Sequence, residues 1–260
     1  MTTTMADTSP VRSDLRINTS YLTHTLLIGL RNPAFLMFTV ALPLTYYLLF
    51  SSMYSSSSVN AVSFNDVYTV NMATFGSINA ALAGGTRIEA ELTSGWLRQV
   101  RLTPLSSLGF LLTRTITALL FELPPILVLY VVGASRSTSG TPIWSWVGSG
   151  ATVWLGSIPF ILIGLLIGLF LKNEAAMPAS VAVMTLMALV GGLWIPLQVF
   201  PGWVRDASHL VPSAWMARYG QDILSGAASS AGGVLVYVVW ISAVGGLVAF
   251  LLGRSLSSRR

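Results

Sequence analysis

Six long apolar segments restrict this chain of 260 residues to a membrane fold more strongly than any other feature of its sequence. They are residues 34–52, 67–85, 108–132, 144–171, 175–193 and 232–253. A helix that crosses the hydrocarbon core needs about 20 mostly apolar residues. Only 9% of the residues are charged, whereas a soluble domain carries about 25%. The sequence therefore predicts an all-α integral membrane protein with six transmembrane helices.

The basic residues predict which side of the membrane each end of the chain occupies. Cytoplasmic flanks of membrane helices carry an excess of Lys and Arg. Of the 14 basic residues, all but Arg136, Arg205 and Arg218 fall on one set of flanks. We therefore expect a multi-pass protein of the cell (inner or plasma) membrane with both termini in the cytoplasm. The loop 87–114 is then inside the cell, and the loop 201–232 is outside.

The N-terminal region precedes the first span. Residues 1–13 are polar and lack the basic-then-apolar layout of a cleavable signal peptide, so they predict a disordered cytoplasmic tail. In residues 14–32, leucines recur near helical spacing with polar residues between them, which predicts an amphipathic helix in the inner interface. The alternative is a cytoplasmic extension of the first span, but Pro33 favours a bend. Residues 14–260 are expected to form a single membrane domain.

Residues 87–107 concentrate charge in a chain that has little of it. The second span ends in Arg87, Glu89 and Glu91, and Gly95 then breaks the helix. A short amphipathic turn follows, in which Trp96, Leu97, Val100 and Leu102 alternate with Arg98, Gln99 and Arg101. Thr103-Pro104 stops this turn, because proline biases the preceding residue to an extended conformation. Anchoring of this loop in the cytoplasm by positive charge would explain the arginines, but not the other residues. The carboxylates, the glycine and the tryptophan instead predict a surface that another protein binds.

Two motifs resemble those of a transporter family. The pattern Glu-x-x-x-Gly-Trp-Leu-x-x-x-x-Leu-Thr-Pro-Leu-Ser at 91–106 is similar to the coupling-helix region of type-2 (exporter) ABC transporter permeases, the group that includes daunorubicin-resistance permeases. The stretch Trp-Ile-Pro-Leu-Gln-Val-Phe-Pro-Gly-Trp at 194–203, with Leu-Val-Pro at 210–212 and Gly-Gln-Asp-Ile-Leu at 220–224, resembles the family's re-entrant segment between its last two spans. The resemblance implies a cytoplasmic coupling region at 87–107 and an outer re-entrant helical segment at 194–231.

The resemblance also implies partners. A phosphate loop needs Gly-Lys-Ser or Gly-Lys-Thr, and the only lysine, Lys172, lies between Leu171 and Asn173. The chain is therefore expected to be a non-catalytic subunit. ATP and Mg would be bound by two copies of a separate cytoplasmic ATPase. A second permease chain would complete the transporter, as a homodimer rather than a heterodimer. The ATPase would dock on Glu89, Glu91, Gly95, Trp96, Leu97, Arg98, Arg101, Leu102, Thr103 and Pro104.

Polar residues inside the spans are the candidates for a substrate path. Asn71, Phe75 and Asn79 are spaced at i, i+4 and i+8, so they share one face of the second span. Polar faces avoid lipid, so this one either lines a path or joins helices; Tyr46 could face the same space. Glu122 lies within the third span, where a carboxylate is costly. It is predicted either to contact substrate or protons, or to fix packing through a hydrogen bond.

Prolines divide the outer segment into short pieces. Irregular backbone exposed to lipid is excluded from the hydrocarbon core, so these pieces must be buried in protein or lie shallow. The family resemblance favours an outer gate. The candidate gate residues are Pro196, Phe200, Pro201 and Pro212.

The expected function is export of a hydrophobic or amphipathic compound, such as a drug, antibiotic or lipid-like molecule, in the manner of multidrug efflux and antibiotic resistance. One alternative is a permease for a polysaccharide or lipid-linked glycan. Another is a secondary transporter that uses Glu122 as its coupling carboxylate. The chain has no cysteine and shows no catalytic triad or metal cluster, so neither a metal site nor a cofactor in this chain is expected. Its arginines lie at the ends of apolar segments, where they set topology, so nucleic-acid binding is not expected either.

Overall fold

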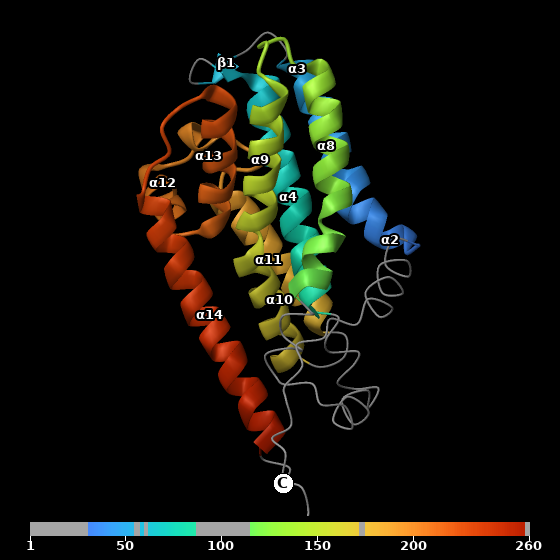
Figure 1. Ribbon diagram of the computed structural model, residues 1–260, viewed down its shortest axis with the longest axis vertical. Coiled ribbons are helices and arrows are strands. Elements are labelled where there is room, and N and C mark those ends of the chain that lie inside the picture. Colours follow the sequence, from blue (N-terminus) through green and yellow to red (C-terminus); the bar gives the residue numbers. More distant parts are fainter. Residues whose placement is uncertain (1–30, 55–57, 60–61, 87–114, 172–174, 258–260) are drawn as a thin grey trace, which may run out of the picture.

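A computed structural model describes residues 31–54, 58–59, 62–86, 115–171 and 175–257. In chain order the labelled elements are α2 (Pro33–Leu36), the π-helical η1 (Met37–Ala41), α3 (Leu42–Met53), β1 (Ser58–Val59), β2 (Val62–Ser63), α4 (Phe64–Thr86), α8 (Leu123–Arg136), α9 (Ile143–Gly156), α10 (Ile158–Phe170), α11 (Ala176–Val190), the 3-10 turn η3 (Leu197–Val199), α12 (Gly202–Ser208), α13 (Pro212–Ser225) and α14 (Gly232–Ser257). The described part is thus a helical bundle (Figure 1), with one short antiparallel strand pair, β1–β2.

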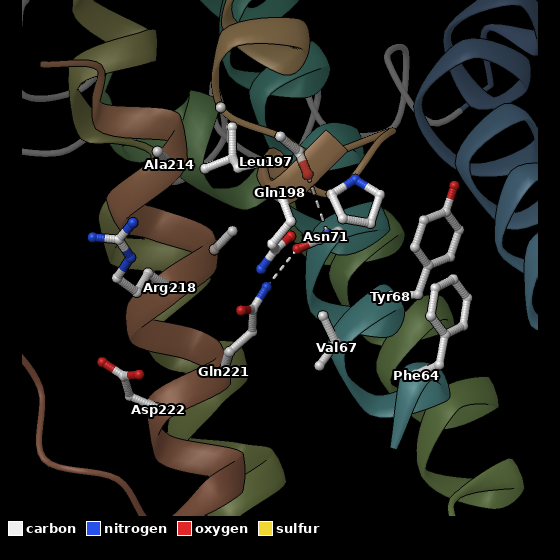
Figure 2. A pocket seen from close by; sticks show the side chains of 14 residues that line it. Phe64, Val67, Tyr68, Asn71, Leu197, Gln198, Ala214, Arg218, Gln221 and Asp222 are labelled. Atoms are coloured by element: carbon white, nitrogen blue, oxygen red, sulfur yellow. Dashed lines mark hydrogen bonds between the residues drawn. The ribbon is translucent and has the colours of Figure 1, made fainter. Parts of the chain in front are cut away.

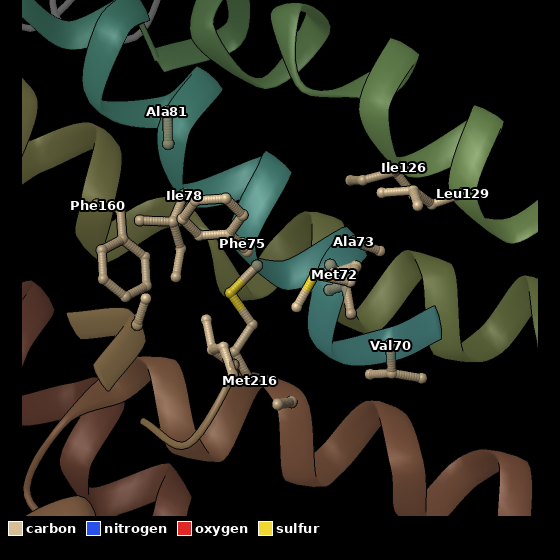
Figure 3. Packing of buried hydrophobic residues seen from close by; sticks show 14 of the residues in the cluster. Val70, Met72, Ala73, Phe75, Ile78, Ala81, Ile126, Leu129, Phe160 and Met216 are labelled. Carbon is tan, nitrogen blue, oxygen red and sulfur yellow. The ribbon is translucent and has the colours of Figure 1, made fainter. Parts of the chain in front are cut away.

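Helix α4 occupies the centre of the bundle (Figure 1) and packs against α3, α8, α9, α10, α11 and α13. Its polar residues Asn71, Thr74 and Ser77 are buried together with its apolar ones. Figure 3 shows Phe75 and Ile78 of α4 facing Phe160 of α10 and Met216 of α13. A helix surrounded by protein has no lipid-facing side, so it does not need an apolar one. This position explains why the second predicted span is more polar than the others.

Small residues bring α4 and α10 into close contact. A Cβ added at Gly85 would meet the backbone nitrogen of Leu165 at 2.6 Å, and one added at Gly164 would meet the carbonyl oxygen of Leu82 at 2.6 Å. Real Cβ atoms are not found that close to backbone atoms. Only glycine fits at this crossing, and the two backbones therefore pack directly against each other, as small residues allow in membrane helices.

Proline explains the irregular start of the first helix. Pro43 lacks the N–H that would bond to the carbonyl of Thr39, and one residue earlier Leu42 donates to the carbonyl of Met37, five residues back. This single π-helical turn is a common response to local disruption of a helix. A Cβ on Gly76 of α4 would lie 2.8 Å from the Thr39 oxygen, so α4 approaches the helix closely at this irregular turn.

Two further predicted spans are interrupted. The helical stretch Thr115–Arg136 contains a turn at Glu122, after which Pro124 and Pro125 lack the N–H groups needed for helix hydrogen bonds. The stretch Ile143–Phe170, predicted over 144–171 as one long helix, is divided at Ser157 into α9 and α10. Pro159 has the same effect there. The fourth predicted span is therefore present as one candidate crossing that is interrupted at Ser157.

Four stretches in the described residues are long and apolar enough to cross a membrane: Pro33–Met53, Thr115–Arg136, Ile143–Phe170 and Gly232–Leu251. The second predicted span corresponds to α4, whose 23 residues rise about 34 Å, enough to cross a core of about 30 Å. The fifth corresponds to α11, whose 15 residues end at Val190 and rise only about 22 Å. The count of six spans stays a prediction.

The segment after α11 turns back on the bundle. Gly192 has a φ of 70°, a left-handed conformation that glycine adopts at no steric cost. The short helices η3, α12 and α13 follow, and they lie in the upper half of Figure 1, where β1 and the α8–α9 connection also lie. The long helix α14 then runs down the side of the bundle (Figure 1), packed mainly on α10.

Candidate functional site

A pocket of about 260 Å³ opens between the first half of α4, the turn after α11 and helix α13. Figure 2 shows its side chains. Helix α4 contributes Phe64, Val67, Tyr68 and Asn71, and the turn contributes Gly191, Gly192, Pro196, Leu197 and Gln198. Helix α13 contributes Arg218, Gln221 and Asp222 on one face, with Ala214 and Ala217. The pocket therefore joins segments that are far apart in the sequence. Asn71 and Gln221, for example, are separated by 150 residues.

A chain of amide hydrogen bonds crosses the pocket. The side-chain Nε2 of Gln221 donates to Oδ1 of Asn71 at 2.6 Å, and Nδ2 of Asn71 donates to the carbonyl of Gly192 at 3.5 Å. Both bonds are drawn as dashed lines in Figure 2. Asn71 is 7% exposed, so its amide needs these partners, because an unpaired buried polar group is costly. The chain ties α4 to α13 and to the turn after α11.

One charge of each sign stands on the α13 side of the pocket. Arg218 and Asp222 are four residues apart, so they are neighbours on the helix surface. The guanidinium carbon of Arg218 lies 4.7 Å from the ring centroid of Trp215, over the ring face. Burial raises the pKa of the Asp222 carboxyl, although a hydrogen bond from Ser229 and the charge of Arg218 act in the opposite direction. The pocket wall thus carries no net charge from this pair.

An aromatic contact joins the first helix to α4 beside the turn after α11. The ring centroids of Phe75 and Trp194 are 5.3 Å apart at 73°, an edge-to-face arrangement that aromatic pairs favour. Tyr46 lies on the other side of Trp194, with centroids 6.5 Å apart, and is 37% exposed. Two of the predicted path residues, Phe75 and Tyr46, therefore meet through a tryptophan that belongs to the outer segment.

Glu122 is fully buried at the interruption of its helix. Its Oε2 accepts a hydrogen bond from the hydroxyl of Ser77 on α4 at 2.7 Å, while Oε1 has no hydrogen bond to the described part of the chain. Nearby, the indole Nε1 of Trp154 donates to the carbonyl of Leu119 at 2.8 Å, a carbonyl in the turn before the interruption. The bond to Ser77 is of the kind expected if Glu122 fixes packing between helices.

The remaining predicted path residue, Asn79, donates from Nδ2 to the carbonyl of Phe38 in η1 at 2.8 Å. The predicted face of α4 therefore has three different sets of neighbours: Asn71 lies in the pocket, Phe75 packs on Trp194, and Asn79 binds the first helix. The five path residues lie on three segments: Tyr46 on α3, Asn71, Phe75 and Asn79 on α4, and Glu122 at the start of α8. Only Asn71 lines the pocket described above. A role in substrate movement stays a prediction for each of them.

The predicted gate prolines shape the turn after α11. Pro196 lines the pocket and precedes η3, Pro201 precedes α12, and Pro212 is the first residue of α13. Proline at a first helical position is favourable because its fixed φ suits the helix and its missing N–H is not needed. Phe200 is half-buried at the end of η3. Their function as a gate stays a prediction.

The predicted docking residues at 87–107 and the N-terminal interface helix at 14–32 fall outside the described residues, apart from Arg31 and Asn32. Asn32 caps the first helical turn, its Oδ1 accepting from the backbone N–H of Ala34 at 3.1 Å. Within the described part of the chain, there is no cluster of three or more His, Asp or Glu side chains that could hold a metal ion.

Sequence reasoning missed most of the pocket. In the sequence, Gln221 and Asp222 belong to the motif at 220–224, and Arg218 contributes only to the count of basic residues on the outer flanks. A signal was available, because Arg218, Gln221 and Asp222 are spaced at i, i+3 and i+4 and so share one face of a helix. What the sequence could not supply is the partner of that face, since Asn71 lies on a helix far away along the chain.

Comparisons with known proteins agree with the resemblance noted in the sequence. No protein-family model matches the chain. Over 213 residues it is 25% identical to the protein named "Putative transport permease YvfS" of Bacillus subtilis (strain 168). The alignment covers 82% of this chain and 87% of that protein. The chain is thus similar over most of its length to a protein named as a transport permease, which supports a membrane transport permease.

Proposed function

We propose that this chain is the transmembrane permease subunit of an ATP-driven exporter that moves a hydrophobic or amphipathic compound out of the cell. The observation that carries the proposal is the position of α4, a helix with buried polar residues at the centre of an apolar bundle. Polar side chains buried in a membrane-spanning bundle, such as Asn71, Thr74 and Ser77, are typical of proteins that move polar or amphipathic groups across the membrane. The similarity to a protein named as a transport permease supports the same function.

The energy source is a separate ATPase. The chain lacks the Gly-Lys-Ser or Gly-Lys-Thr of a phosphate loop, so ATP and Mg would be bound by a partner that docks on residues 87–107. ATP can shift the transporter between two conformations only if it binds one of them more tightly. Closure of two ATPase copies on the coupling region would supply that difference and tilt the spans.

A second permease chain would complete the path. The first helix carries exposed apolar side chains such as Met37, Leu49 and Met53, and α11 carries Met177, Val181 and Leu186. These residues face either lipid or a second copy. Tyr46, which is partly exposed and packs on Trp194, would then lie near the seam between the copies. The outer segment at 194–231 would close the path from the outside.

One observation favours a second candidate, a secondary transporter coupled through Glu122. A fully buried carboxylate with one oxygen lacking a hydrogen bond to the described residues is a suitable proton carrier. The bond from Ser77 weighs against it, since a packing function already accounts for the residue. The two candidates differ in their energy source and can be separated directly.

The test is transport in proteoliposomes, with and without the ATPase that co-purifies with this chain, using a panel of fluorescent amphipathic drugs. We expect accumulation that requires both ATP and the ATPase, together with cargo-stimulated ATP hydrolysis. Movement of the same compounds down a proton gradient without any ATPase would refute the exporter and favour the secondary transporter. Docking is tested separately, because Glu89→Ala with Arg98→Ala should reduce ATPase co-purification. Equal recovery of the ATPase with this variant would contradict docking at 87–107.

A further inference from the structure

The pocket between α4 and α13 has the hydrogen-bonding chemistry of a site for a neutral ligand. Three carboxamides line it, from Asn71, Gln198 and Gln221, and a carboxamide both donates and accepts. Gln221 uses one N–H on Asn71, and Gln198 is an exposed side chain. Neither the carbonyl oxygen of Gln221 nor the amide of Gln198 has a hydrogen bond to the described part of the chain. These groups are available for a ligand that offers both donors and acceptors.

The charges in the pocket disfavour an ionic ligand. Arg218 and Asp222 line the same wall and have opposite signs, so an anion attracted by one is repelled by the other, and the reverse holds for a cation. Arg218 is also engaged over the face of Trp215, which holds its guanidinium at that ring. A group without net charge avoids the cost of removing an ion from water and can still accept from Arg218 and donate to Asp222.

The α4 side of the pocket adds apolar surface. Val67, with Leu197 of the turn after α11, supplies aliphatic groups, whereas Phe64 and Tyr68, only 7% and 2% exposed, add small parts of rings that stack on each other at 16° with centroids 5.2 Å apart. A ligand that fits must therefore present hydrogen-bonding groups on one side and C–H groups on another. A hydroxylated ring has this arrangement, because its hydroxyls lie at the rim and its C–H bonds point from its faces.

We propose that this pocket binds a neutral, multiply hydroxylated ring with the chemistry of a sugar, carried as the polar head of the exported molecule. The volume of about 260 Å³ lies just below the range of about 300–1,000 Å³ typical of drug-sized ligands, so it suits one ring and not an oligomer. The inference rests on the proposed function, because that function makes the ligand a cargo and places the pocket towards the outside.

The test uses the full chain, in lipid nanodiscs free of glycolipid and without ATPase, with methyl β-D-glucopyranoside as the probe. Binding is measured by saturation-transfer NMR over a concentration series. We expect saturable binding that weakens about five-fold in Gln198→Ala, the change expected for one lost hydrogen bond of about 1 kcal/mol. Binding should weaken by more than that in Gln221→Met, which also removes the bond to Asn71 across the pocket. Gln198 is exposed, so its substitution does not endanger folding. Thr45→Val, which removes a hydroxyl bonded within its own helix on α3, is the matched control and should bind normally.

Two further probes test the class of ligand. Choline and acetate should each bind at least ten-fold more weakly than the glucoside. The inference would be overturned by the absence of saturable glucoside binding, by binding in the Gln198→Ala and Gln221→Met variants as strong as in the unchanged chain, or by stronger binding of choline or acetate. Because no ATPase is present in this assay, such a result would not bear on the exporter proposal. Conversely, failure of ATP-driven transport in a protein that still binds the glucoside would refute the exporter proposal and leave the binding site standing.

Discussion

The hydrogen bond between Asn71 and Gln221 allows a quantitative test of how the outer segment is held on α4. The Nε2–Oδ1 distance is 2.6 Å, and Asn71 is 7% exposed. Removing one partner, as in Asn71→Leu or Gln221→Met, leaves the other amide unsatisfied, which costs about 1–3 kcal/mol. Replacing both removes the orphaned group as well, so the double variant should lose less stability than the sum of the single variants.

The expected coupling energy follows from measured membrane-protein hydrogen bonds, which average about 0.6 kcal/mol and reach about 1.7 kcal/mol. The short distance and the burial of Asn71 place this bond in the upper part of that range, at about 1–1.7 kcal/mol. The measurement is a double-mutant cycle on the free energy of unfolding, obtained by reversible unfolding of the purified chain in mixed detergent micelles. Gln221→Met should also release α13 from α4, which protease access or hydrogen exchange along α13 would detect.

The matched control pairs Gln221→Met with Asn79→Leu. Asn79 lies on the same helix, two turns from Asn71, but it donates to the carbonyl of Phe38 instead. Independent sites add to within about 0.3–0.5 kcal/mol, so this cycle should show no coupling beyond that. Additive effects for Asn71 and Gln221 together, or equal coupling in both cycles, would refute the view that the amide pair holds α13 on α4.

Three other changes test separate parts of the structure. Gly85→Ala should destabilise the chain by at least about 1–3 kcal/mol, since its Cβ would meet the backbone of α10 at 2.6 Å. As a control, Gly246→Ala should not lower the free energy of unfolding, because nothing lies within 4 Å of the added Cβ. Equal losses in the two variants would contradict the close crossing of α4 and α10. Glu122→Gln keeps an oxygen that can accept from Ser77, so ATP-driven transport should continue at a similar initial rate; its loss would favour a coupling function for the carboxylate. Asp222→Asn should raise the melting temperature slightly at neutral pH, because the raised pKa of the carboxyl means that the folded protein disfavours its charged form. That penalty is fully present above the folded pKa and disappears as pH falls below the unfolded value of about 3.9. The difference in melting temperature should therefore shrink in acid, and a difference that grows in acid would show that burial does not dominate.

The helical class and the approximate positions of the helices could be predicted because apolar length is a local property of the sequence. The polarity of α4 also gave a correct indication that this helix avoids lipid. The interruptions at Glu122 and Ser157 were harder, because a proline inside an apolar run permits a kink but does not determine whether the helix ends there. At Ser157 the apolar run continues on both sides, so the length of the run does not indicate the interruption.

The pocket shows the limit of sequence reasoning more clearly. Asn71 could be selected because a polar face in an apolar segment is unusual. Its partner Gln221 could not, because the pair depends on how α13 turns back after Gly192, which no local pattern encodes. Pro196 and Pro212 indicated that the segment is broken into pieces but not which helix those pieces cover.

The two helix interruptions also have a mechanical consequence. Trp154, just before the break at Ser157, donates to the carbonyl of Leu119, just before the break at Glu122, so the two weak points lie side by side. Beyond them, Tyr130 of α8 and Ser149 of α9 share a hydrogen bond of 2.8 Å, and Ser149 donates to the carbonyl of Gly220 in α13 at 2.7 Å. Bending at this shared hinge would move α8, α9 and α13 together, because these hydrogen bonds join them. A tilt on one side of the hinge would therefore reach the pocket without changing the contacts among the three helices.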